Sequence, residues 1–90
     1  MASVRILKKE INKEVAYFID DCYEHIIKND ENEKEIEGLV NRAVEIYDEV
    51  LDGVNEATKK ENPAPTFKKL RSSLIEQLND LKIKLAKKNA

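Results

Sequence analysis

The sequence has little of several residue types from which binding sites and sharp turns are built. Its 90 residues include one cysteine, one histidine, two glycines, two prolines and no tryptophan. One cysteine excludes an intrachain disulfide, and so few glycines and prolines exclude a sandwich or barrel of many short strands. We therefore expect a single domain over residues 1–90 that is held together by the packing of its apolar side chains.

The residues that are abundant predict an all-α fold. Hydrophobic residues make up 41% of the chain, which is more than a disordered protein contains. In three stretches they recur at steps of three and four, the spacing that places side chains on one face of an α-helix. The pattern predicts helices over residues 3–28, 33–60 and 66–88, and short connections predict an antiparallel up-down-up three-helix bundle that can dimerise.

Polar residues and one glycine predict the ends of the first two helices. Ser3 is the expected N-cap of the first helix, and Asp30 or Asn32 is the expected N-cap of the second. Gly53 lies inside the second apolar stripe, where it costs about 1 kcal/mol relative to alanine. Because the stripe continues beyond Gly53, we extend the second helix to about residue 60.

The clearest break in the helical pattern is the segment 62–66, which contains both prolines. Each proline disfavours helix in the residue before it and lacks an N–H donor. The third helix is expected to begin here, capped either by Thr66 or by Asn62 with Pro63 at the first helical position.

The formal net charge of −2 conceals an uneven distribution. Basic and acidic residues number five and five over residues 1–29, four and eleven over 30–62, and seven and two over 63–90. Glu45, Glu49 and Asp52 lie opposite the apolar stripe of the second helix and are expected to face solvent. They form either a solvated acidic surface or a docking surface for a basic partner protein.

The basic third segment raises a second functional hypothesis, a nucleic-acid-binding accessory protein. Its charges, however, project at several angles around the helix, and no aromatic residues are interleaved with them for base stacking. We therefore keep nucleic-acid binding as the alternative and expect that nucleic acid is not the main partner.

The only cluster that resembles a chemical site contains Asp21, Cys22 and His25. A structural zinc site needs four ligands, and the chain has no second cysteine or histidine. Cys22 and His25 also lie near the C-terminal end of their helix, where the helix dipole disfavours a thiolate. No phosphate-binding glycine loop or hydrolase motif is present, so we expect no catalytic residue, no cofactor and no metal site.

Several apolar residues lie outside the core stripes. Tyr23, Ile27 and Ile83 either widen the faces that contact neighbouring helices or form an exposed patch for self-association or a partner helix. Tyr17 lies near the polar back of the first helix, where it is either an interface anchor or an amphipathic surface residue. With no catalytic constellation in the chain, we expect a non-catalytic protein-interaction or self-association module, for which a homodimer is one form. The residues do not identify the partner protein.

The N-terminal residues and the apolar runs bear on location. Lys8 and Lys9 interrupt the N-terminal segment, so it contains no apolar region long enough for a secretory signal. No run approaches the roughly 18 apolar residues that span a bilayer. Together with the single cysteine, this predicts a cytoplasmic protein without a membrane partner.

Two short segments carry a family resemblance. Residues 4–12, Val-Arg-Ile-Leu-Lys-Lys-Glu-Ile-Asn, and residues 20–23, Asp-Asp-Cys-Tyr, resemble small all-helical bacterial proteins that have no assigned function. The resemblance implies a small helical fold in a bacterial cytoplasm. It supplies no catalytic or binding residues.

Overall fold

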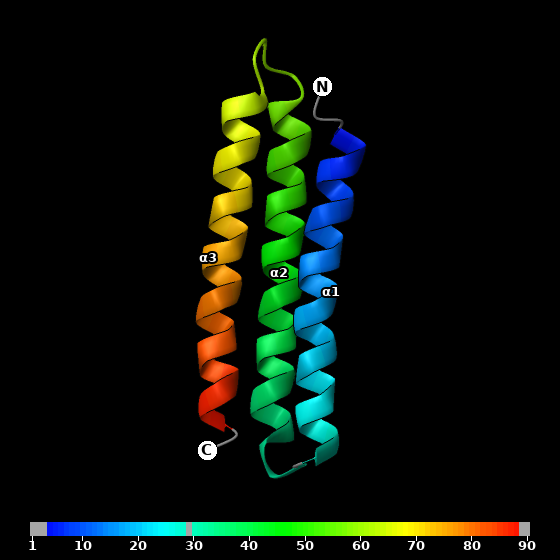
Figure 1. The fold of residues 1–90 in the computed structure, drawn as a ribbon, viewed down its shortest axis with the longest axis vertical. Helices are drawn as coiled ribbons and strands as arrows, with labels where there is room; N and C mark the ends of the chain where they lie inside the picture. Colours follow the sequence, from blue (N-terminus) through cyan, green and yellow to red (C-terminus); the bar gives the residue numbers. More distant parts are fainter. Residues whose placement is uncertain (1–3, 29, 89–90) are drawn as a thin grey trace.

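The chain folds as an antiparallel three-helix bundle, in agreement with the prediction. The computed structural model describes residues 4–28 and 30–88 and contains helices α1 (Val4–Lys28), α2 (Glu33–Ala57) and α3 (Ala64–Lys88), with a short 3₁₀ turn, η1 (Asp30–Asn32), between the first two. No strand occurs in these two ranges. The chain runs down α1, up α2 and down α3, and α2 lies between the other two helices (Figure 1).

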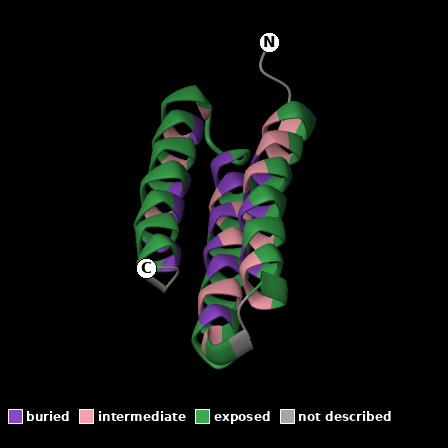
Figure 2. Cartoon of the chain, turned by 60° about the horizontal axis from the view of Figure 1, so that its bottom comes forward, coloured by how far each residue is buried: buried purple, intermediate pink, exposed green. Residues whose placement is uncertain are grey.

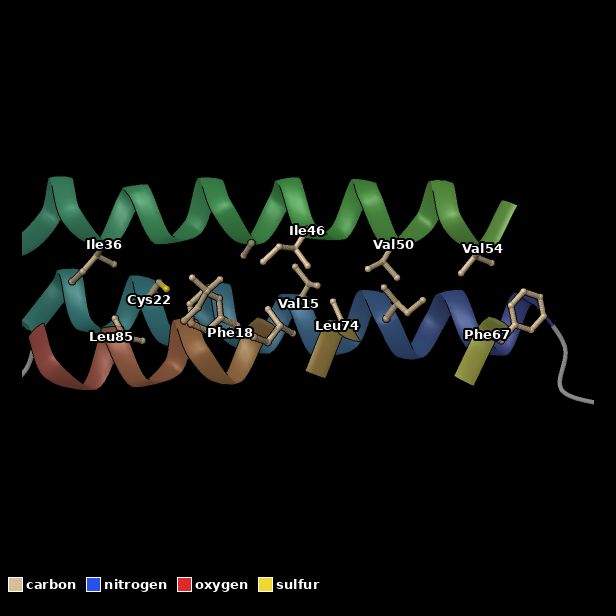
Figure 3. Packing of buried hydrophobic residues seen from close by; sticks show 14 of the residues in the cluster. Val15, Phe18, Cys22, Ile36, Ile46, Val50, Val54, Phe67, Leu74 and Leu85 are labelled. Carbon is tan, nitrogen blue, oxygen red and sulfur yellow. The ribbon is translucent and has the colours of Figure 1, made fainter. Parts of the chain in front are cut away.

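One apolar core runs along the bundle. Figure 2 shows buried residues on the sides of the helices that face one another and exposed residues on the outer sides. The buried side chains, several of them labelled in Figure 3, are Ile11, Val15, Phe18, Cys22, Ile36, Ala43, Ile46, Val50, Val54, Ala57, Phe67, Leu74, Leu78, Leu81 and Leu85. All are hydrophobic, and no buried polar or charged residue is found in the part of the chain that the structure describes. The helix α2 packs extensively against both neighbours, whereas α1 and α3 contact each other less.

The predicted end of the second helix is wrong by three residues. The helix continues through Gly53 but ends at Ala57 rather than at residue 60. Beyond it the N–H groups of Lys59 and Lys60 bond to carbonyls three residues back, at 3.2 and 3.0 Å, so the chain tightens into turns that satisfy carbonyls left open by the helix. The Thr58 hydroxyl donates to the Asn55 carbonyl at 2.6 Å.

The helix α2 begins at the predicted residue, Glu33, but the predicted cap interaction is not formed. Asn32 occupies the N-cap position, and its side chain makes no capping hydrogen bond. The predicted N-cap of α1, Ser3, lies outside the described residues.

The third helix begins at Ala64, two residues before the predicted start. The Phe67 N–H donates to the Pro63 carbonyl at 3.0 Å, so Pro63 itself occupies the N-cap position, and the expected caps Thr66 and Asn62 are wrong. Pro65 is accommodated because the first N–H groups of a helix have no intrahelical partner, so its missing donor costs nothing there.

The two glycines of α2 have different surroundings, which leads to a prediction. A Cβ added at Gly53 would lie 2.8 Å from Cδ2 and 3.2 Å from Cδ1 of Leu70 on α3, whereas one added at Gly38 would have no such neighbour within 4 Å. Gly38→Ala should raise the free energy of unfolding by roughly 0.5–1 kcal/mol through helix propensity. Gly53→Ala should raise it less, because the Leu70 side chain must move.

Urea denaturation of the two alanine variants checks this difference. Equal stabilisation by both substitutions would mean that Leu70 moves without cost and that close approach of α2 and α3 does not require Gly53.

Candidate functional site

The cluster of Asp21, Cys22 and His25 does not form a reactive centre in the structure. The Cys22 side chain is fully buried in the core. Burial, and secondarily the negative charge of Asp21, raises the pKa of its thiol from 9.0 to about 11. The thiol is therefore protonated at neutral pH. Nucleophilic attack and metal ligation both need the deprotonated form, the thiolate. His25 is half-buried, and no group of histidine, cysteine and acidic side chains that could hold a metal ion occurs among the described residues.

Two adjacent shallow hollows lie along the seam between α1 and α3. Glu10 and Arg71 line both hollows, and they face each other with 3.4 Å between Arg71 Nη1 and Glu10 Oε2. Ile6 and Phe67 contribute apolar surface to one hollow and Ile75 to the other. The ion pair therefore crosses the seam between α1 and α3, which contact each other less than either contacts α2.

The predicted acidic surface on α2 is present but partly compensated. Glu45, Glu49 and Asp52 are all exposed. Arg42 lies among them, with its Nη1 atom 3.0 Å from Glu45 Oε2 and 3.9 Å from Glu49 Oε1. Two of the three carboxylates thus share one guanidinium, which reduces the charge available to a basic partner.

The basic side chains of α3 do not form one surface. Arg71 pairs with Glu10 of α1 on one side of the helix. Lys68 lines the hollow between α1 and α3, while Lys84 lines a depression between α2 and α3. These positions agree with the spread of angles that the sequence predicts.

The apolar residues singled out from the sequence are exposed and do not belong to the core. The exposed fractions are 57% for Tyr17, 51% for Tyr23, 83% for Ile27 and 56% for Ile83. The structure puts the first three on α1, whereas Ile83 lies on α3. Lys13 extends over the Tyr17 ring, with Nζ 5.7 Å from the ring centroid.

Sequence reasoning missed three further exposed apolar residues. Ile6 is 57% exposed, Val44 42% and Ile75 40%. The position of Ile6 about 140° from Ile11 around α1 was a sign of exposure that the sequence already contained. With Ile6 included, α1 carries four of the seven large hydrophobic side chains that are exposed in the described ranges.

The structure and the comparisons add two findings. In residues 4–28 and 30–88 no helix has an apolar stretch long enough to cross a membrane. Comparisons of the chain with protein-family models, with curated proteins and with solved structures found no match.

Proposed function

We propose that this chain is a non-catalytic protein-interaction module that acts through the outer surface of α1. The observation that carries the proposal is the gathering of four exposed large hydrophobic side chains, Ile6, Tyr17, Tyr23 and Ile27, on this one helix. Single exposed apolar residues are common on protein surfaces, whereas a concentration of them marks an interaction site.

The energetics favour a partner on this helix. Complete burial of one isoleucine side chain contributes about 1.5–3 kcal/mol, and Ile27 is 83% exposed in the isolated chain. A partner that covers Ile27 and its apolar neighbours on α1 therefore gains several kcal/mol, which offsets part of the entropy lost on association. Burial and protonation of the single thiol support a role without catalysis.

The alternative role, nucleic-acid binding by α3, has less support. The guanidinium of Arg71 on that helix already pairs with Glu10. Lys68 and Lys84 lie on different sides of α3. We propose a cytoplasmic location, supported by a chain whose single cysteine forms no intrachain disulfide and lies buried in the core.

Photo-crosslinking in cells tests the interaction module. A benzophenone amino acid placed at Tyr17 or Ile27 should give covalent protein adducts, because a bound partner covers these side chains. The matched control is the same group at Asn79, an exposed position on α3, which should give few adducts.

The masses of the adducts distinguish a second copy of the chain from a different protein. The absence of adducts at both α1 positions, or equal yields at all three positions, would show that α1 carries no binding surface.

A further inference from the structure

The solvent side of α1 carries two separate charge clusters. Lys9 and Lys13 lie one turn apart in its first half, and Asp20 and Glu24 lie one turn apart in its second half. At 100° per residue all four project from the side of the helix opposite Phe18, and all four are exposed. No ion pair joins any of them to another described residue.

Each of these clusters places two like charges one turn apart in the isolated chain. Like charges four residues apart on a helix repel each other by roughly 0.2–0.5 kcal/mol per pair. The helix α1 has one such basic pair and one such acidic pair. A second α1 in antiparallel orientation would bring Lys9 against Glu24 and Lys13 against Asp20. A parallel second helix would instead place lysines against lysines, so the pattern selects the antiparallel orientation.

The apolar residues on the same side follow the same symmetry. In that antiparallel register Ile6 faces Ile27 at each end of the contact, and Ala16 faces Tyr17 at its centre. Ile6, Tyr17 and Ile27 are 57%, 57% and 83% exposed, and Ala16 is exposed as well. A small and a large side chain thus meet at the centre. An isoleucine contact lies at each end of the interface, and these two contacts are about 31 Å apart.

We propose that this outer side of α1 is the interface between two copies of the chain, which pack with their first helices antiparallel. The proposal rests on the interaction module proposed above and names its partner. The α1 helix lies at one side of the bundle (Figure 1), so a second copy can approach it without displacing α2 or α3. Two-fold symmetry makes every pairing occur twice, so four ion pairs lie between the apolar contacts at the centre and at the ends of a closed dimer.

Charge exchange between the two clusters tests this dimer. Sedimentation equilibrium at low ionic strength should show a wild-type dimer that weakens as salt is added, since screening acts over about 10 Å at 0.1 M salt. Lys9→Glu with Lys13→Glu should raise the dissociation constant at least tenfold, because acids then face acids. Asp20→Lys with Glu24→Lys should do the same, and an equimolar mixture of the two double variants should associate again.

A matched control changes the net charge without changing α1. Lys84→Glu with Lys87→Glu, at exposed positions on α3, should leave the dissociation constant of the dimer within about twofold of wild type. Circular dichroism should show the same helical content in all variants, since every substituted side chain is exposed.

Two results would overturn the dimer. One is a wild-type chain that stays monomeric at sub-millimolar concentration. The other is a dimer whose dissociation constant is unchanged by both charge reversals, or is not restored when the two double variants are mixed. Either result leaves the interaction module standing if a crosslinker at Ile27 captures a different protein. The module itself fails only if the α1 positions give no specific adduct.

Discussion

Replacement of Phe18 by alanine should lower the free energy of unfolding by about 3–5 kcal/mol. The Phe18 side chain has no exposed surface and points from α1 into the core among residues of the other two helices (Figure 3). Its removal loses the transfer free energy of the ring and leaves a cavity that rigid helices fill only in part. A small domain has a total stability of roughly 5–15 kcal/mol, so the variant should be partly unfolded near physiological temperature.

Urea denaturation followed by circular dichroism measures this effect, and the neighbouring residue supplies the control. Tyr17→Ala should cost less than about 1 kcal/mol, because Tyr17 is 57% exposed. Leu74→Ala, at 1% exposed on α3, should cost about 2–5 kcal/mol and tests the same core from another helix. Similar costs for Phe18→Ala and Tyr17→Ala would mean that the buried face of α1 is assigned wrongly.

The Cys22 thiol should react with a disulfide reagent at least about a thousandfold more slowly in the native chain than in the chain unfolded by guanidinium at the same pH. Cys22 has no exposed surface, so the reagent reaches it only when the core opens, and opening of a core region approaches the global free energy of unfolding. Phe18→Ala should speed the native reaction by the factor by which it raises the equilibrium constant of unfolding, about tenfold for each 1.4 kcal/mol of stability lost. A native chain that reacts as fast as the unfolded chain would contradict the burial of Cys22.

The raised pKa of Cys22 adds a pH dependence with a defined sign. Because the thiol holds its proton up to about pH 11 in the folded chain and up to about pH 9 when unfolded, the unfolded state loses protons first as the pH rises. The free energy of unfolding should therefore decline between these two pH values. Cys22→Ala removes this part of the decline, and all other titrating groups are common to both proteins, so the difference between their pH profiles isolates the thiol.

The sequence pattern predicted the three helices well and their ends less well. The pattern alone could not decide whether Gly53 ends α2. In the structure Gly53 lies where Leu70 of α3 approaches α2, so the glycine serves a contact between helices that are distant in sequence. The start of α3 was misplaced because the prolines were interpreted as breaks, although the first turn of a helix tolerates Pro65 without loss of a hydrogen bond.

The candidate surface was predicted only in part. Tyr23 and Ile27 were recognised from the sequence as apolar residues outside the core stripe, but two interpretations remained open, contact with a neighbouring helix or exposure. Tyr17 was expected near the polar back of the first helix, either as an interface anchor or as a surface residue. The ion pairs of Arg42 with the acidic surface and of Arg71 with Glu10 were not predicted. In the second of these, the two residues come from different helices, and only the packing of α1 against α3 brings them together.

The sequence by itself determined three amphipathic helices and the face that each one buries, because the helical repeat is a local property and the apolar residues follow it. Only the tertiary structure decided which residues beside those faces stay exposed. Ile19 packs against the core, whereas Tyr23, one turn later and about 40° further around α1, is 51% exposed. The difference arises because a side chain on the flank of a helix is covered only where a neighbouring helix lies over it, and the position of that neighbour is set by the packing of the whole bundle.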